Sequence, residues 1–139
     1  MDLKLELVLV PVDDVDRAKA FYSEQAGFHV HVDHQVGDTF RVVQLDPPGS
    51  SCSIAVGIGI TDAEPGSVRG LHLVVTDIVA ARDELVSRGV DVSGIRHMSE
   101  SGWQAGPHPD RVDYNSFANF SDPDGNTWVL QERGHNNTA

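Results

Sequence analysis

Alternating apolar and polar positions predict a series of β-strands in the first half of the chain. In "LKLELVLVPV" (3–12) every odd position up to 9 is leucine and the end is wholly apolar, a pattern typical of a strand. Three segments that alternate or are rich in β-branched and aromatic residues predict further strands, at 28–34, 39–46 and 51–58. The sequence "DPPGSS" (46–51) predicts a turn between the last two of these strands.

Two segments follow the helical period instead. Each begins after an aspartate that can cap the first turn and ends at a glycine, so we expect helices from Asp14 to Gly27 and from Asp77 to Gly89. The apolar residues at helical spacing, which we expect to be buried, are Val15, Ala18, Phe21 and Tyr22 in the first helix and Ile78, Ala81 and Leu85 in the second. Strands are predicted around the second helix at 69–75, 90–97, 116–121 and 126–132.

This order of elements repeats within the chain. The pattern predicts one α+β domain of two tandem βαβββ units, at about 1–62 and about 68–133, followed by a polar tail (134–139) that we expect to fray. Each unit alone leaves one sheet face uncovered, so we expect two curved mixed sheets to pair around a central cavity.

The segment 98–115 lies outside the repeat and shows no regular pattern. A long irregular loop is often functional, and this one contains Trp103, glycines and prolines. Trp103 therefore suggests either a lid over a cavity or an aromatic anchor that pins the loop on a sheet surface.

Composition narrows the function classes. The chain has 10 basic and 21 acidic residues, for a net charge of −11, which disfavours nucleic acid as a partner. The acidity serves solubility or favours a cationic ligand. No apolar run approaches 18 residues, and Cys52 is a single cysteine, so we expect a cytoplasmic protein that neither spans a membrane nor has an intrachain disulfide. Cys52 is interpreted as a small buried apolar residue.

The segments "VPVDDVDRAKAFYSEQAGF", "LHLVVTDIVAARDELVSRGV" and "FSDPDGNTWVLQE" together resemble the vicinal oxygen chelate superfamily over residues 3–133. That superfamily includes glyoxalase I, extradiol dioxygenases and proteins of bleomycin and fosfomycin resistance. The resemblance implies the fold, whereas a fold of this kind supports many activities. It also implies a homodimer.

Metal-dependent members of the superfamily bind a divalent ion through His and Glu on the first and last strands of each unit. The resemblance places three of those positions at Leu7, Gly70 and Val129, and the corresponding strand 52–60 contains neither an acid nor a histidine. Hydrocarbon side chains and glycine offer no ligand atoms. We therefore expect no metal and no other cofactor.

Two other histidine patterns could carry chemistry. His72 lies two residues beyond Gly70 and Gln131 two beyond Val129, so strand alternation directs both to the cavity side. His72 is interpreted as a ligand-orienting group, a lone acid/base, or a hydrogen-bonded space-filling residue. In "HVHVDH" (29–34), His29, His31 and Asp33 are expected to share one face, which we interpret as solvated polar surface and not as a chelate.

The stretch "DPDGN" (122–126) resembles a calcium loop only superficially, because Pro123 and the missing distal Glu break that pattern. We interpret it as a turn between the last two strands.

The sequence thus predicts a metal-free protein that sequesters a drug-like or metabolite ligand in an apolar cavity. The alternative is a cofactor-independent lyase or isomerase that uses His72 as acid/base on a small carbonyl metabolite, and not glyoxalase I. A structural or regulatory role has no support in the sequence. The expected ligand-binding residues are Leu7, Leu9, His72, Val74, Trp103, Val129 and Gln131.

Overall fold

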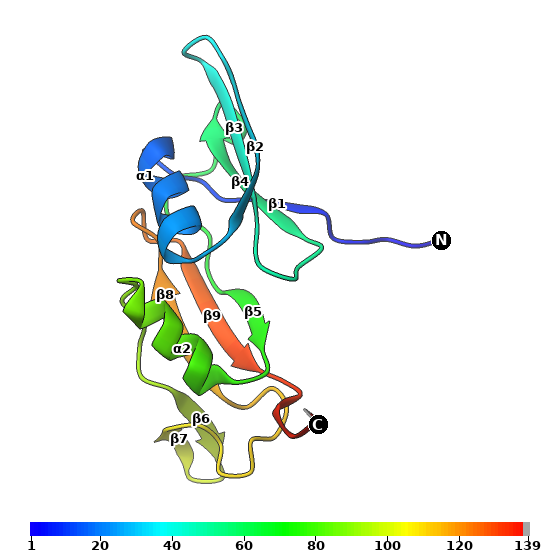
Figure 1. Cartoon of the computed structure of the whole chain (residues 1–139), viewed down its shortest axis with the longest axis vertical. Helices are drawn as coiled ribbons and strands as arrows, with labels where there is room; N and C mark the ends of the chain where they lie inside the picture. The colour runs from blue at the N-terminus through cyan, green and yellow to red at the C-terminus, as the bar shows by residue number, and fades with distance from the viewer. Residues whose placement is uncertain (138–139) are drawn as a thin grey trace. The chain divides into compact units, whose positions relative to one another are not determined.

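The computed structural model describes residues 1–137, which form two compact units (Figure 1). The first unit comprises Met1–Val68 together with Asp122–Asn126, and the second comprises Arg69–Ser121 and the residues from Thr127 onward. Each unit contains a mixed sheet and a helix, so the predicted α+β class with two tandem units is confirmed. No helix among residues 1–137 is long and apolar enough to cross a membrane.

The first unit follows the predicted βαβββ order. Its sheet has the strand order β1-β4-β3-β2, in which β1 is parallel to β4 and the other neighbours are antiparallel. The elements are β1 (Leu7–Leu9), α1 (Val15–Ala20), the π-helical turn η1 (Phe21–Gln25), β2 (His29–Val36), β3 (Phe40–Asp46) and β4 (Ser53–Ile58).

The second unit repeats this order with one additional strand. Its sheet has the order β5-β9-β8-β6-β7, with β5 parallel to β9. The elements are β5 (Leu71–Val75), α2 (Ile78–Ser87), β6 (Arg96–Ser99), β7 (Gly102–Ala105), β8 (Phe117–Ser121), β9 (Thr127–Glu132) and the 3-10 turn η2 (His135–Asn137). In Figure 1, α2 lies across one face of this sheet.

The capping aspartates act as predicted. The Asp14 carboxylate accepts a hydrogen bond from the Arg17 amide, and the Asp77 carboxylate accepts one from the Ala80 amide, both at 3.1 Å. Of the predicted buried positions, Val15, Ala18, Phe21, Tyr22 and Ile78 are buried, while Ala81 and Leu85 are half-buried. The helical segments end at glycines with positive φ, 80° at Gly27 and 90° at Gly89.

Two predicted strands are shorter in the structure by more than two residues. The first extends over Leu7–Leu9 only, and residues 1–6 are exposed outside any strand. The strand expected at 90–97 begins only at Arg96. Ser93 lies alongside β8 in the preceding stretch, where its hydroxyl accepts the Asn119 amide at 2.8 Å. A side-chain acceptor thus replaces a regular ladder bond there.

The segment 98–115 was expected to be irregular, but part of it forms regular structure. Its beginning belongs to the β6–β7 hairpin, in which Trp103 pairs with Met98. Trp103 therefore stands on a strand of the sheet and not in an irregular loop, and its role as a lid over a cavity stays a prediction. The alternative interpretation, an aromatic residue held on a sheet surface, describes its position.

The "HVHVDH" segment departs from strict alternation. A bulge shifts the register between Val30 and Val32, which lie opposite the consecutive residues Leu45 and Gln44. Because consecutive residues point to opposite faces of a strand, the bulge places His29 and Asp33 on opposite faces. The expectation of one shared face for His29, His31 and Asp33 is therefore wrong.

The "DPDGN" stretch forms the predicted turn between β8 and β9. The Gly125 amide donates to the Asp122 carbonyl at 3.0 Å, and Gly125 has a φ of 94°. The turn also belongs to the core of the first unit, since Asp122 and Asn126 are buried. The Asp122 carboxylate accepts hydrogen bonds from the Tyr22 hydroxyl at 2.7 Å, from two amides of its own turn and from the Asn126 side chain.

The polar tail is anchored as far as the structure describes it. Gly134 donates its amide to Asp113 at 2.7 Å, and the His135 ring bonds the Thr76 carbonyl at 2.9 Å. The expectation that the tail frays is wrong for residues 134–137. Residues 138 and 139 lie outside the described part of the chain.

Candidate functional site

The sheet of the second unit has one face packed against the core and one open face. Trp128, Leu130 and Glu132 of β9 are at most 2% exposed, whereas the alternate residues Val129 and Gln131 are half-exposed. Because side chains alternate across a strand, Val129 and Gln131 lie on the open face.

Four of the predicted site residues come together on that face. His72 pairs with Val129 and Val74 pairs with Gln131 in the parallel β5–β9 ladder. Both His72 and Val74 are exposed, Val74 by 55%. The strand alternation in the sequence thus predicted correctly that the members of these two neighbouring cross-strand pairs lie on one face.

The open face continues across the sheet to Trp103. Gln131 pairs with Phe117, Phe117 with Arg96, and Arg96 with Ala105, so one row of side chains crosses all five strands. The Trp103 and Phe117 rings meet edge to face, with their centroids 5.7 Å apart. The Arg96 guanidinium lies 5.2 Å from the Trp103 ring centroid and 6.0 Å from that of Phe117.

Phe117 and Arg96 also lie on this face but were not among the residues predicted from the sequence. Phe117 carried a usable signal, because it lies three residues before Phe120 on a predicted strand and hence on the opposite face. Arg96 carried none, because its contact with Trp103 depends on a hairpin that the pattern did not reveal.

The open face has few polar side chains, and two of them, His72 and Gln131, already form hydrogen bonds with backbone carbonyls. The His72 ring nitrogen Nδ1 lies 2.6 Å from the Gly70 carbonyl oxygen. A carbonyl only accepts hydrogen bonds, so Nδ1 bears the proton and Nε2 of neutral His72 keeps its lone pair. The Gln131 amide donates to the Tyr114 carbonyl at 3.2 Å. The face thus offers an imidazole, an amide and a guanidinium beside aromatic and aliphatic surface.

A hollow of about 380 Å³ adjoins this surface. It shares Asn119 with the open face, where Asn119 pairs with Val129. The remaining lining residues are mostly polar: Asp91, Ser93, Phe120, Ser121 and Thr127. The hollow therefore adds polar groups at the border of the more apolar open face, and polar groups beside apolar surface are typical of small-molecule sites.

Leu7 and Leu9 belong to the first unit. They stand on β1 opposite Ser53 and Ala55 of β4, and each is 39% exposed. Their participation in one site with the residues of the second unit stays a prediction from the sequence.

The residues at the expected metal-ligand positions do not suit a divalent ion. The Val129 side chain is a hydrocarbon without a ligand atom. Gly70 has no side chain, and its backbone amide donates a hydrogen bond to the Thr127 hydroxyl. The neighbouring donors are one imidazole and one amide, a poor set for a divalent cation. No mechanism through a metal at this face follows from these residues.

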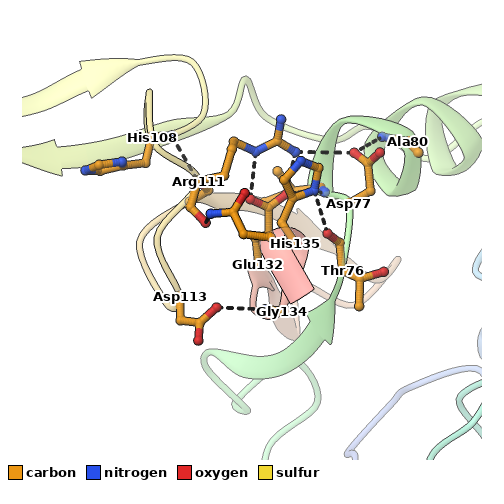
Figure 2. Close-up of polar contacts among 12 residues, drawn as sticks. Thr76, Asp77, Ala80, His108, Arg111, Asp113, Glu132, Gly134 and His135 are labelled. Atoms are coloured by element: carbon orange, nitrogen blue, oxygen red, sulfur yellow. Dashed lines mark hydrogen bonds and ion pairs between the residues drawn. The ribbon is translucent and has the colours of Figure 1, made fainter. Parts of the chain in front are cut away.

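One group of potential ligands lies elsewhere in the described chain. Asp77, Glu132 and His135 place one ligand atom each within 4.8 Å of the others. Figure 2 shows that Arg111 occupies this cluster. Its Nε and Nη2 donate to the two Glu132 oxygens at 2.7 and 2.6 Å, and Nη2 approaches Asp77 at 3.4 Å. The guanidinium supplies the positive charge here, so the cluster is an ion-pair network and not a metal centre.

The network determines the charge of its members. Burial of Glu132 works to raise its pKa, but hydrogen bonds from Arg111 and from the Ile78 amide outweigh that effect and lower it. The Asp77 pKa is lowered chiefly by the Ala80 amide, with Arg111 contributing. Arg111 has its own pKa raised by Glu132. Glu132 is therefore a buried carboxylate that stays ionised because Arg111 faces it.

Comparison with known proteins agrees with this architecture. The Glyoxalase/Bleomycin resistance protein/Dioxygenase superfamily profile matches residues 4–130. TnmS3, an antibiotic binding protein from Streptomyces sp. CB03234, is 34% identical with a TM-score of 0.72, covering 94% of this chain and 96% of TnmS3. A glyoxalase/bleomycin resistance protein from the same source is 35% identical with a TM-score of 0.69, covering 92% of this chain and 99% of its own.

A more distant relative is YetH of Bacillus subtilis (strain 168). It is 23% identical over 126 residues, which make up 90% of this chain and 94% of YetH. The match to the family profile extends over nearly the whole chain and includes both units. The protein belongs to the Glyoxalase/Bleomycin resistance protein/Dioxygenase superfamily.

Proposed function

We propose that this protein binds and sequesters a small, drug-like or metabolite molecule with a planar aromatic part, on the open face of the β5–β9 sheet and without a metal. The observation that carries the proposal is a row of side chains across the sheet, with Trp103 and Val129 beside it. The row consists of Val74, Gln131, Phe117 and Arg96. An exposed apolar face with a small number of polar groups marks a binding surface. TnmS3, a similar protein, is an antibiotic binding protein, which supports an antibiotic-like ligand.

The charges on this face refine the ligand chemistry. The net charge of −11 favours a cationic molecule in general. Locally, however, Arg96 places a cation over Trp103. An aromatic ligand at this end therefore fits best when its nearby substituents are neutral or anionic, and any cationic group lies away from Arg96.

We expect that Trp103→Ala weakens ligand binding about tenfold, close to 1.4 kcal/mol, because the ligand loses an aromatic surface. The ligand panel comprises bleomycin and planar polycyclic antibiotics of the anthracycline class. Binding is measured by isothermal titration calorimetry, because removal of Trp103 also removes a fluorescent reporter.

Val86→Ala is the matched control, since Val86 is 45% exposed on α2. This variant should bind with unchanged affinity. If no member of the panel binds the wild type, or if both variants behave alike, the assignment of this face is refuted.

Metal independence is tested separately. Protein purified without chelator should contain far less than one divalent ion per chain by elemental analysis, and EDTA should leave the affinity for a ligand unchanged. The reason is the donor set of the face, in which Val129 and Gly70 offer no side-chain ligand. One tightly bound divalent ion per chain would contradict the metal-free proposal.

A second candidate function rests on His72. Its Nδ1–H faces the Gly70 carbonyl, which leaves Nε2 as a proton acceptor in the neutral ring. The corresponding activity is metal-independent isomerisation or lyase chemistry on a small carbonyl compound. A turnover that His72→Gln abolishes, with binding retained, would favour this enzyme over pure sequestration.

A further inference from the structure

The hollow beside the open face lies on the same side of β8 as the aromatic surface. Phe117, Asn119 and Ser121 alternate with the two buried residues of β8, so their side chains point to one face. With a rise of about 3.4 Å per residue, Asn119 lies about 7 Å and Ser121 about 14 Å from Phe117 along the strand. The hollow, which Asn119 and Ser121 line, therefore begins directly beyond the row that contains Phe117.

Three polar side chains in the hollow have no partner within residues 1–137. Asp91, Asn119 and Ser121 form no side-chain hydrogen bond or ion pair in that part of the chain. By contrast, the hydroxyls of Ser93 and Thr127 each accept a hydrogen bond from a backbone amide. The hollow therefore offers a carboxylate, a carboxamide and a hydroxyl that are all available to a ligand.

These groups define the chemistry of a complementary ligand. A carboxylate only accepts hydrogen bonds, whereas a carboxamide and a hydroxyl both donate and accept them. Among the described residues, no basic side chain lines the hollow, so Asp91 gives it a negative charge. A divalent metal ion requires more carboxylate oxygens than this one side chain supplies. A protonated amine with neighbouring hydroxyl groups matches the charge and the hydrogen-bonding groups together.

We propose that the hollow is a subsite for a protonated amino group with adjacent hydroxyls, of the kind that an amino sugar attached to an aromatic molecule provides. This inference rests on the proposed function, because it assigns a second part of the same ligand. The ammonium group lies against Asp91, and the hydroxyls bond to Asn119 and Ser121. The volume of about 380 Å³ is that of about a dozen molecules of liquid water, which is room for one substituted six-membered ring.

Charge gives such a ligand one direction on the face. The Arg96 guanidinium lies beside the Trp103 ring, and Arg96 pairs with Phe117 at the aromatic end. Asp91 lies in the hollow with Asn119. A ligand with its ammonium group toward Asp91 keeps that group away from Arg96, whereas the reversed orientation places two positive charges together. Attraction at one end and repulsion at the other therefore select the same orientation.

The test compares three ligands by isothermal titration calorimetry: daunorubicin, its N-acetyl derivative and its aglycone. The first has a positively charged amino sugar, the second a neutral sugar and the third no sugar. Asp91→Asn should weaken daunorubicin binding about tenfold and leave the other two affinities unchanged, because it removes only the charge that faces the ammonium group. Asp91 is exposed and without a partner in the described chain, so this variant should fold normally.

Asn119→Leu tests the hydrogen bonds to the sugar. It should weaken both glycosides about fivefold and leave the aglycone unchanged, because leucine is similar in size but cannot hydrogen bond. The contacts of Asn119 with Ser93 use its backbone groups, which the substitution retains. Asp83→Asn is the matched control for Asp91→Asn, since Asp83 is also exposed, lies on α2 and changes the net charge equally. This control should leave all three affinities unchanged.

The outcomes separate this subsite from the aromatic face. If Trp103→Ala weakens aglycone binding but Asp91→Asn has no effect specific to daunorubicin, the face is supported and the subsite is overturned. If Asp91→Asn acts specifically on daunorubicin while Trp103→Ala has no effect, the subsite is supported and the aromatic face is overturned. Equal affinity of the wild type for daunorubicin and its aglycone would also overturn the subsite. Absence of binding by all three ligands would overturn both.

Discussion

Replacement of Arg111 by methionine should lower the free energy of unfolding by about 3 kcal/mol at pH 7. Glu132 is fully buried, and both of its oxygens are bonded by Arg111. Removal of one partner leaves an uncompensated buried charge, which costs about 3–5 kcal/mol. Arg111 keeps 21% of its side chain exposed, so water entry favours the lower end of this range. Tryptophan fluorescence during urea unfolding reports the change, because Trp103 and Trp128 both lie in the second unit.

The matched control is Arg111→Met/Glu132→Gln. This double variant removes the buried charge along with its partner, and the glutamine oxygen can still accept the Ile78 amide. It should therefore recover a large part of the lost stability. If the double variant is as unstable as Arg111→Met, the ion pair is not the cause.

The pH dependence gives an independent check. The folded pKa of Glu132 is lowered below 4.5, so its stabilising contribution is complete above about pH 4.5 and is lost as the pH falls through the folded pKa. Without Arg111 the buried carboxyl takes up a proton more readily. The stability difference between wild type and Arg111→Met should thus shrink as the pH falls from 7 to 4. A difference that stays constant with pH would contradict the electrostatic explanation.

Asp122→Ala should destabilise the first unit by about 3 kcal/mol or more. The buried carboxylate accepts four hydrogen bonds, two from turn amides and one each from the Tyr22 hydroxyl and the Asn126 side chain. Alanine leaves several buried donors without this acceptor, and each costs about 1–3 kcal/mol. Far-UV circular dichroism and hydrogen exchange at the Ala18 amide of α1 measure the effect in the first unit.

Tyr22→Phe is the graded comparison for Asp122→Ala. It removes one of the four donors and leaves the packing of the ring with Phe28, whose centroid is 5.5 Å away. We expect a loss of about 1 kcal/mol. Equal losses for Tyr22→Phe and Asp122→Ala would show that the turn amides contribute little.

The sequence predicts the parts of the fold that depend on local signals. Asp14 and Asp77 cap their helices, and the alternation in β5 and β9 places His72, Val74, Val129 and Gln131 on one face. Capping and alternation involve neighbouring residues, so one sequence suffices to recognise them.

The features that the sequence did not predict depend on distant partners. The bulge in β2 is defined only against β3, and the strand position of Trp103 only against Met98. Glu132 shares a strand face with Trp128 and Leu130, which signals a buried carboxylate that needs a counter-charge. That counter-charge lies 21 residues earlier in a loop, and no local pattern connects Arg111 to Glu132.

The turn at 122–126 has a consequence for biosynthesis. Residues 122–126 complete the first unit. The Asp122 carboxylate accepts a hydrogen bond from the Tyr22 hydroxyl, and the Asn126 side chain donates to the Pro11 carbonyl and accepts from the Val68 amide. Contacts between residues so far apart along the chain slow folding, because a long loop must close before they form. On the ribosome, residues 1–68 therefore emerge without these partners, and they reach their final packing only after residues 122–126 have been synthesised as well.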